Sequence, residues 1–254
     1  MGTLDGQVAI VTGGSRGVGR GVALGLAEAG ATVYSTSRSG VAALERAAAG
    51  PGTVVALPCD HRQDAAVAAA FTSVIGREGR LDVLVNNVWG GYEAMVEDGV
   101  FTWERPFWEQ PLWRWDAMFQ AGVRAHYVAS QLAAAAMIGR RSGLIVNISS
   151  LAGREYGGNA AYGVAKAATD RLAADMAHEL RPYNVAAVSL SPGLVRTERV
   201  LEFAAFLDLS ASESPLFSGR AVAALAADPA IMRKSGQVLT TAALAAEYGF
   251  RDDR

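Results

Sequence analysis

Tyr162 and Lys166, in the stretch YGVAK, have the clearest potential for acid–base chemistry in this sequence. Residues four apart in a helix project from the same face, so the ammonium would lie close to the phenol. A free tyrosine has a pKa of about 10, and a nearby positive charge lowers it by favouring the phenolate. Such a tyrosine can give a proton to a forming alcohol or take one from an alcohol. The same spacing occurs on ordinary exposed helices, so its meaning depends on what surrounds it.

Two serines, Ser149 and Ser150, follow an apolar run at residues 144–148 that predicts a buried strand. Ligands of open α/β folds bind at the carboxyl ends of the strands, where these hydroxyls would lie. Ser150 is separated from Tyr162 by a short glycine-containing stretch, and its hydroxyl could hydrogen-bond a substrate oxygen. The alternative is a serine that caps a helix or forms a turn.

A glycine-rich loop, TGGSRGVG at residues 12–19, lies directly after a predicted strand and opens a predicted helix. Glycines in such a loop allow a tight turn and a close approach to a pyrophosphate, while the helix start offers free N–H groups to the anion. The strand–loop–helix context supports this interpretation over a plain tight turn. The predicted cofactor-binding residues of the loop are Gly13, Ser15, Arg16, Gly17, Val18 and Gly19.

The residues after the second predicted strand indicate which dinucleotide binds. NAD-binding folds place an acidic residue there for the ribose 2′-hydroxyl, but this chain has Arg38 and no acid. Arginine pairs with a 2′-phosphate through charge-assisted hydrogen bonds, whereas an acid would repel it. Arg16 adds a second positive charge. Each arginine alone could be a solvated surface group, but together they favour NADP(H).

The elements that must position these residues alternate between strands and helices along the whole chain, which predicts βαβ units and a parallel sheet. We therefore expect an α/β fold, a Rossmann-type doubly wound parallel sheet, in a single domain over residues 1–254. Helices are predicted at residues 20–29, 41–49 and 63–76. The predicted strands are residues 7–11, 31–35, 53–58, 81–85, 144–148 and 185–190, with a possible seventh at 237–239.

One segment, residues 88–116, interrupts this alternation and holds all five tryptophans of the chain. It is either a loop that packs its own aromatic side chains, for example against a partner subunit, or an apolar wall for a substrate. Aromatic side chains line most small-molecule pockets, so both interpretations stay open.

Composition narrows the class of function. Hydrophobic residues make up 51% of the 254 residues and the net charge is −2, which indicates a folded protein without the basic surface that nucleic acids need. A single cysteine, Cys59, and three scattered histidines give no metal-ligand pattern. No signal peptide or membrane segment is apparent, so we expect a cytoplasmic location.

In this order along the chain, the TGxxxGxG loop, the pair Asn86-Asn87, the serine after residues 144–148, the YxxxK pair and Pro192-Gly193 resemble the short-chain dehydrogenase/reductase family. The resemblance covers essentially the whole chain. It implies a nicotinamide-dependent oxidoreductase, acting on a carbonyl or alcohol, that assembles as a homodimer or homotetramer through the helices after the fourth and fifth strands.

The resemblance also implies roles for individual residues. Ser150 would hold the substrate oxygen, Tyr162 would be the acid–base group, and Lys166 would bind the nicotinamide ribose and lower the tyrosine pKa. Asp60 would contact the adenine amino group, and Asn87 would touch the ribose through its backbone. The residues bordering the nicotinamide carboxamide would be Pro192, Gly193, Val195 and Thr197, and Arg38 matches the position that marks NADP preference.

The chain departs from the family pattern in several places. Gly122 stands where the family has an asparagine that holds a water in the proton relay behind the lysine; a backbone-held water or His126 could substitute. The NNAG motif reads NNVWG, with bulkier Val88 and Trp89. The interval from Ser150 to Tyr162 is one residue shorter than in many members, so Ser149 is an alternative. Residues 240–246 replace the usual C-terminal DGG, which could reshape the pocket edge or an oligomer contact.

These observations favour an NADP(H)-dependent carbonyl reductase or alcohol dehydrogenase, with the aromatic segment suggesting a hydrophobic substrate. A second hypothesis, prompted by Gly122, is a non-catalytic NADP(H)-binding sensor or scaffold, although such a protein would not need Ser150, Tyr162 and Lys166 together. A third, a methyltransferase, fits poorly because those enzymes usually keep an acid after the second strand.

Overall fold

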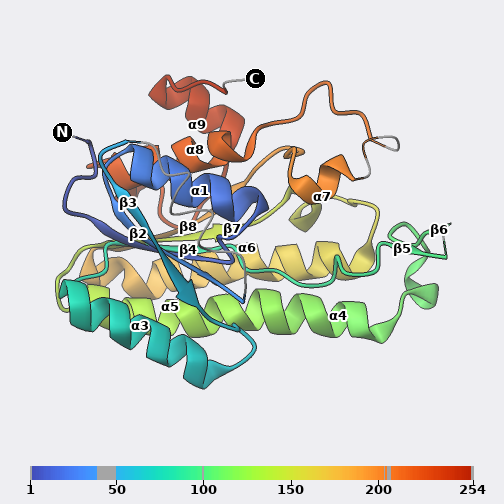
Figure 1. The fold of residues 1–254 in the computed structure, drawn as a ribbon, viewed down its shortest axis with the longest axis horizontal. Helices are drawn as coiled ribbons and strands as arrows, with labels where there is room; N and C mark the ends of the chain where they lie inside the picture. The colour runs from blue at the N-terminus through green and yellow to red at the C-terminus, as the bar shows by residue number, and fades with distance from the viewer. Residues whose placement is uncertain (1, 39–49, 99, 203, 205–206, 253–254) are drawn as a thin grey trace.

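The chain folds into three layers, with a parallel sheet between two layers of helices (Figure 1). The computed structural model describes residues 2–38, 50–98, 100–202, 204 and 207–252. The seven strands of the sheet are β1 (Val8–Thr12), β2 (Thr32–Ser37), β3 (Thr53–Pro58), β4 (Val83–Asn86), β7 (Gly143–Ile148), β8 (Val185–Ser191) and β9 (Val238–Thr240).

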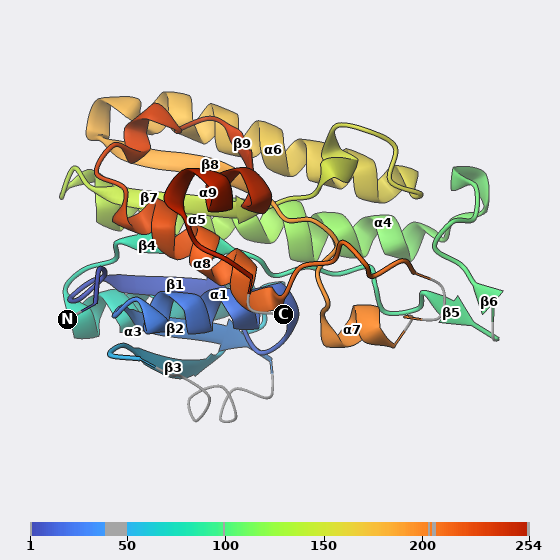
Figure 2. The same cartoon turned by 90° about the horizontal axis from the view of Figure 1, so that it is seen from above.

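All neighbouring strands of this sheet run parallel, in the order β3-β2-β1-β4-β7-β8-β9 (Figure 2). The order reverses direction between β1 and β4, which is the topological switch point where open α/β sheets bind ligands. The predicted Rossmann-type doubly wound sheet in a single domain is confirmed, including the seventh strand. Each predicted strand lies within one or two residues of the observed one, because strands buried on both faces are nearly continuous apolar runs.

Two layers of helices cover the sheet. Helices α1 (Gly17–Glu28) and α8 (Pro215–Ala227) pack against each other on one face, with α9 (Thr241–Tyr248) beside α8. The other face carries α3 (Asp64–Glu78), α5 (Ala125–Ile138) and α6 (Ala160–Leu180) (Figure 1). The shorter helical elements are η1 (Phe107–Glu109), α4 (Leu112–Met118), η2 (Phe119–Arg124), η3 (Leu151–Gly153), η4 (Arg181–Tyr183), α7 (Glu198–Leu201) and η6 (Ile231–Arg233).

The sheet separates two apolar cores. Alternate residues of β1 divide between them: Ala9 and Val11 pack with α1 and α8, and Val8 and Ile10 pack with α3, α5 and α6. Burial of this apolar surface is the main favourable contribution to folding. The strands are thereby fixed in register, and their carboxyl ends meet at one edge of the sheet.

Several predicted boundaries change. Helix α1 begins at Gly17 rather than residue 20, so the second half of the glycine loop already forms the first helical turn. The helix predicted over residues 41–49 lies outside the described residues. Residues 88–116 contain a hairpin of β5 (Val96–Glu97) and β6 (Val100–Phe101), then η1 and most of α4. Figure 2 shows β5, β6 and α7 beyond the carboxyl ends of the central strands.

The elements α4, η2 and α5 follow one another without a break, and η2 is a π-helical turn. Such a turn holds one extra residue and is frequent at functional sites. Among the described residues, no helix is both long and apolar enough to cross a membrane.

Candidate active site

Helix α6 presents Tyr162 and Lys166 on one face at the carboxyl edge of the sheet. Asn159 caps the start of this helix, and its side-chain oxygen accepts a hydrogen bond from the Tyr162 N–H at 3.0 Å. Asparagine is a favoured residue at this position because its oxygen satisfies an N–H group that has no acceptor within the helix. The Asn159 amide also donates to the Trp103 carbonyl at 2.9 Å. One buried residue therefore fixes the start of the helix and ties it to the aromatic segment.

The Tyr162 side chain lies between two hydroxyl groups and an indole. Hydrogen bonds with Ser150 and Tyr92 both lower its pKa, but burial has the larger effect, so the pKa is raised overall. The Tyr162 ring lies 5.3 Å from that of Trp103 and 6.0 Å from that of Tyr92. The phenol is therefore protonated at neutral pH, as a proton donor must be.

Lys166 is buried, with a relative exposure of 4%. Its Nζ donates to the Ile148 carbonyl at 3.0 Å, lies 5.7 Å from the Tyr162 ring centroid, and lies only 3.6 Å from the Trp89 ring centroid. Burial lowers the lysine pKa to about 7, although the carboxylate of Asp170 opposes this. The ammonium and the neutral amine are therefore both accessible near neutral pH.

The structure distinguishes the two serines. Ser150 is the hydrogen-bonding partner of Tyr162, and its Oγ also accepts from the Ala152 N–H at 3.3 Å. Ser149 is buried, and its Oγ has no hydrogen-bonding partner among the described residues. Ser150 is therefore the serine whose hydroxyl contacts Tyr162, and it also caps the short helix η3.

The glycine loop wraps the start of α1, as predicted from its sequence. Gly17 has φ +56°, which favours glycine, and its N–H donates to the Glu198 carboxylate at 2.8 Å. An acidic group thus already occupies the positive end of the helix dipole, which shows that this end accepts an anion. The Asn87 amide donates to the carbonyls of Thr12 and Gly13 at 2.9 and 3.0 Å. Asn87 therefore braces the loop with its side chain.

The residues predicted to meet the adenine half of a dinucleotide lie next to β2 and β3. Arg38 is exposed at the end of β2. Asp60 follows β3, and Arg62 grips its carboxylate, with Nη2 at 2.6 Å and Nε at 3.0 Å from the two oxygens. Hydrogen bonding to Arg62, with a smaller effect of Arg38, holds the Asp60 pKa at about 2. Asp60 is therefore a carboxylate with two guanidinium neighbours at this edge of the sheet.

The loop after β8 is held by a residue that the sequence did not single out. Glu213 accepts from the Gly193 N–H at 3.1 Å and from the Thr241 hydroxyl at 2.6 and 2.7 Å. Its backbone pairs with that of Val195. The loop contains the predicted residues Pro192, Gly193, Val195 and Thr197, and Thr197 caps α7. The altered C-terminal stretch therefore reaches this loop through Thr241.

The aromatic segment divides into an inner and an outer part. Trp89 and Trp103 pack around Tyr162, together with Tyr92. Phe107 and Trp108 point outward, with exposures of 68% and 71%. Arg114 links the two parts: it is fully buried, lies 5.8 Å from the Trp103 ring and 5.1 Å from the Trp113 ring, and donates to the Ala94 and Thr102 carbonyls.

Comparison with known proteins decides the family of this site. The family model for short chain dehydrogenases matches residues 7–206. The chain belongs to the short-chain dehydrogenase family. This family consists of oxidoreductases that transfer hydride with nicotinamide cofactors.

Three known proteins illustrate the similarity. The chain is 45% identical to mouse (Mus musculus) and 43% identical to human (Homo sapiens) dehydrogenase/reductase SDR family member 1, over 98% of its own length and 84% of theirs. A solved structure of 7α-hydroxysteroid dehydrogenase, complexed with NADH and 7-oxo glycochenodeoxycholic acid, superposes with a TM-score of 0.78. It is 25% identical and covers 94% of each chain.

Gly122, at the position where the family resemblance predicts an asparagine, lies in the π-helical turn η2. A Cβ at Gly122 would lie 2.6 Å from Trp89 Cζ3, so the indole fills the space beside it. His126, a possible substitute in the proton relay, pairs with the Val88 carbonyl at 3.0 Å. Burial lowers the His126 pKa to about 3, so its ring is neutral.

The site residues fit a dinucleotide, since the glycine loop, the helix start and Arg38 follow one another along the carboxyl edge. The sequence assigned no role to Tyr92, Asn159, Glu198 and Glu213, and it marked Trp89 only as a bulky departure from the family motif. An asparagine just before a predicted helix is a capping signal that could have revealed Asn159. The contacts of the other four residues join distant segments, and no local pattern predicts those contacts.

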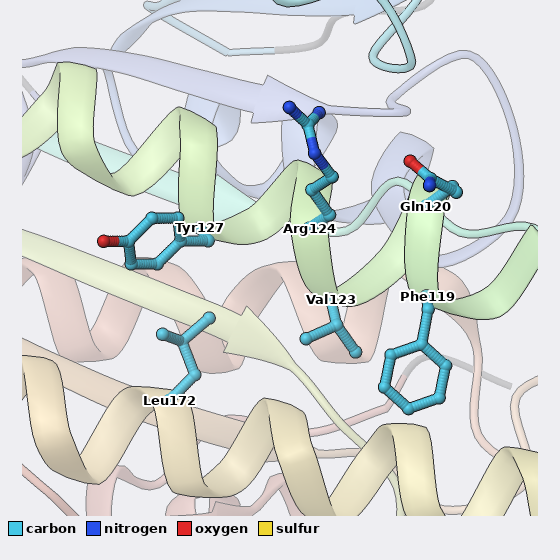
Figure 3. A pocket seen from close by; sticks show the side chains of 6 residues that line it. All are labelled: Phe119, Gln120, Val123, Arg124, Tyr127 and Leu172. Atoms are coloured by element: carbon cyan, nitrogen blue, oxygen red, sulfur yellow. The ribbon is translucent and has the colours of Figure 1, made fainter. Parts of the chain in front are cut away.

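A separate surface hollow of about 330 Å³ lies between α6 and the continuous helix formed by η2 and α5, and it contains none of the predicted site residues. In Figure 3, Phe119 and Val123 point toward α6, whereas Gln120 and Arg124 point to the opposite side. Its lining is completed by Tyr127 and Leu172. The hollow is mainly apolar and lies on the two helices through which the family resemblance predicts oligomer contacts.

Proposed function

We propose that this chain is an NADP(H)-dependent carbonyl reductase or alcohol dehydrogenase for hydrophobic substrates, with Tyr162 as the acid–base group. The observation that supports this most is the arrangement of Tyr162. Its hydroxyl is hydrogen-bonded by Ser150 and Tyr92, a lysine lies one helical turn away, and indoles surround its ring. A protein that only senses or stores the cofactor has no need for this combination.

Each side chain has a distinct part in the reaction. NADP(H), when bound, supplies or accepts the hydride at the carbon that changes oxidation state. In reduction, Ser150 hydrogen-bonds the carbonyl oxygen and Tyr162 gives its proton to that oxygen. Lys166 binds the ribose of the cofactor, and its positive charge favours the phenolate left on Tyr162. In oxidation the same groups act in reverse.

The preference for NADP(H) rests on charge. Arg38 and Arg16 are both exposed near the carboxyl edge, with no acid after β2 to repel a 2′-phosphate. Arg16 occupies the N-cap position of α1, and its side chain makes no capping hydrogen bond. Asp60 contacts the adenine amino group in this proposal. Its carboxylate forms an ion pair with Arg62, which offsets its negative charge.

The substrate preference rests on the inner aromatic residues. Tyr92 and Trp103 pack around Tyr162, and Met95 and Phe101 lie behind them. Polar side chains capable of binding a sugar or a phosphate are not part of this cluster as described. An apolar wall beside a hydrogen-bonding pair of hydroxyls suits a ketone or secondary alcohol on a bulky carbon skeleton.

Arg38→Asp tests the cofactor assignment. This change should weaken NADPH binding by roughly 30-fold to 1,000-fold, because a charge-assisted contact is lost and a repulsion is introduced. Binding of NADH should stay the same or strengthen, because an acid at this position can bind the ribose 2′-hydroxyl. Fluorescence titration with NADPH and NADH measures both affinities. A panel of bulky ketones is then assayed for turnover by the consumption of the reduced cofactor. Unchanged NADPH affinity would contradict the assignment.

The proposal includes a homodimer or homotetramer formed through α5 and α6. The support is the apolar hollow between these helices, beside which Tyr127 is half exposed. Tyr127→Glu should shift the mass found by light scattering toward the monomer, since a charge on an apolar contact surface is costly. An unchanged mass would show that subunits do not contact one another through the surface around Tyr127.

A further inference from the structure

The buried Lys166 ammonium has an aromatic face as its second partner. Its Nζ makes a hydrogen bond to the Ile148 carbonyl at 3.0 Å and lies 3.6 Å from the centre of the Trp89 ring. The electron-rich face of an indole attracts a cation, and the attraction strengthens where water is excluded. Lys166 is almost fully buried, so the indole compensates part of the solvation that the ammonium has lost.

Trp89 can hold this place only because residue 122 has no side chain. A Cβ at Gly122 would lie 2.6 Å from Cζ3 and 2.8 Å from Cε3 of the indole. Contacts this short require movement, and a packed indole is rigid. Gly122 is buried within the π-helical turn η2. A side chain at 122 and the present position of Trp89 therefore exclude each other.

This exclusion explains two departures from the family pattern as one change. Where the family motif NNAG has a glycine, this chain has Trp89, and where the family has an asparagine, this chain has Gly122. The large residue and the small residue have exchanged places across the same space. The space that a side chain at residue 122 would enter is filled here by the indole.

The exchange changes what the space can do chemically. The ring face attracts a cation but neither donates nor accepts a proton, and the indole N–H is a donor only. The other ionisable groups facing Lys166 are Asp170 and Tyr162 on its own helix and His126 on α5. His126 is neutral, so its ring adds no charge that could replace the indole.

We propose that Trp89 is the positioning residue for Lys166, and that Trp89 and Gly122 form a matched pair that replaces the asparagine side chain of the family pattern. The indole holds the ammonium toward Tyr162 and favours its charged form. No proton crosses the space behind the lysine. The role in catalysis rests on the proposed function, whereas the contact between indole and ammonium does not.

The two lysines of the chain make a direct test possible. Only Lys166 and Lys234 are present, so protein carrying isotope-labelled lysine gives two side-chain signals in NMR. Lys234, which pairs with Glu247 on the surface, is identified by Lys234→Arg. The Lys166 signal should be displaced upfield by the ring current of Trp89. Its pKa should fall by roughly half to one and a half units in Trp89→Leu and much less in Trp89→Phe.

The matched comparison of leucine with phenylalanine separates electrostatics from volume. Both residues are smaller than tryptophan, but only phenylalanine keeps an aromatic face. Equal lysine pKa values in the two variants, or a wild-type signal without the upfield displacement, would overturn the proposal. In turnover assays, Trp89→Leu should move the pH profile of alcohol oxidation to higher pH, because an uncharged lysine no longer favours the Tyr162 phenolate.

The exchange of sizes is tested by a double-mutant cycle. Gly122→Asn alone should lower the midpoint of thermal unfolding, because the new side chain meets the indole. In the Trp89→Gly background, Gly122→Asn should lower the midpoint of thermal unfolding much less, or should raise it. Additive effects in the cycle would contradict the matched pair. Both the NMR titration and the unfolding cycle are read without turnover, so their failure is distinguishable from failure of the proposed oxidoreductase activity.

Discussion

At the scale of single residues, the hydroxyl of Tyr162 is controlled by its neighbours rather than by its own intrinsic acidity. Burial raises its pKa, whereas hydrogen bonds from Ser150 and Tyr92 lower it. Tyr92 is the less expected of the two neighbours, since it comes from the aromatic segment. Its own pKa is raised far above the usual value by burial and by Tyr162. Tyr92 therefore stays protonated and donates to the Tyr162 oxygen.

Tyr92→Phe removes this donor while keeping the ring. The pKa of Tyr162 should rise by roughly half to one unit, the size of one net hydrogen bond. Alcohol oxidation needs the phenolate, so its pH profile should move to higher pH by the same amount. Stopped-flow assays across pH measure this. Tyr156→Phe is the control, because that ring is 78% exposed. An unmoved profile for Tyr92→Phe would remove Tyr92 from the acid–base network.

Single residues also mark the limit of prediction from sequence. The placement of Tyr162 and Lys166 on one face follows from their spacing, because both lie in helix α6. The choice between Ser149 and Ser150 does not, since neighbouring residues at a strand end point in opposite directions and the sequence leaves both open. The contact between Trp89 and Lys166 joins segments far apart in the chain, and no local pattern predicts it.

At the scale of elements, the start of α1 is held by an acidic side chain. Glu198, the first residue of α7, accepts a hydrogen bond from the Gly17 N–H, and its Oε1 lies 3.7 Å from Arg20 Nη1. A pyrophosphate would need the same N–H groups. Cofactor binding should therefore require the loop after β8 to release this contact, which couples α7 to the cofactor.

Glu198→Gln should strengthen NADPH binding by about two-fold to ten-fold at low salt, because a neutral amide competes less well for the helix start. Isothermal titration calorimetry at two salt concentrations measures the change, which should shrink as salt screens the charge. Glu202→Gln is the matched control, since Glu202 pairs with Arg199 instead. Weaker NADPH binding in Glu198→Gln would mean that the carboxylate helps to order the loop.

The elements themselves were largely predictable where the chain forms short apolar runs bounded by turn residues. Residues 53–58 form β3 as predicted, and the other sheet strands differ by one or two residues at their ends. The secondary structure of the aromatic segment could not be predicted from its sequence. Its strands β5 and β6 have only two residues each, which is too short for an alternating pattern to be detected. The π-helical turn at Phe119–Arg124 was also invisible, since one extra residue in a turn leaves the apolar pattern almost unchanged.

At the scale of the whole molecule, the parallel sheet gathers residues from distant parts of the sequence at one edge. The glycine loop follows β1, Ser150 follows β7 and the loop of Pro192 follows β8. Because all the strands point the same way, motifs that follow strands must meet, and the site could be assembled from sequence order alone. What order cannot give is the division of the aromatic residues into an inner and an outer group, since exposure depends on the packing of α4 and the hairpin.

The stability of the molecule should depend on pH through two buried histidines. Burial lowers the pKa of His61 to about 4 and that of His126 to about 3. Below about pH 6.5 the unfolded chain binds protons at these positions and the folded chain does not. The free energy of unfolding should therefore fall as pH drops from about 6.5 toward 4, by roughly 1.4 kcal/mol per pH unit for each histidine.

Urea unfolding at a series of pH values measures this dependence. In the double variant with His61→Asn and His126→Asn, the free energy of unfolding should change less with pH between about pH 6.5 and 4. This holds whatever the stability of the variant at neutral pH. His178→Asn is the control, because that side chain is exposed. A double variant with the slope of the wild type would assign the acid sensitivity to other groups.

Single-turnover oxidation of bound NADPH in the wild type and in Tyr162→Phe tests the central claim most directly. Both proteins should bind NADPH with the same affinity, because the variant loses only the hydroxyl. With a bulky ketone the wild type should consume the bound cofactor, and the variant should be slower by at least about 100-fold, the usual contribution of a positioned acid–base group. Equal rates of NADPH oxidation in the two proteins would contradict the role of Tyr162. The account would also be contradicted if neither protein oxidised bound NADPH with any ketone of the panel.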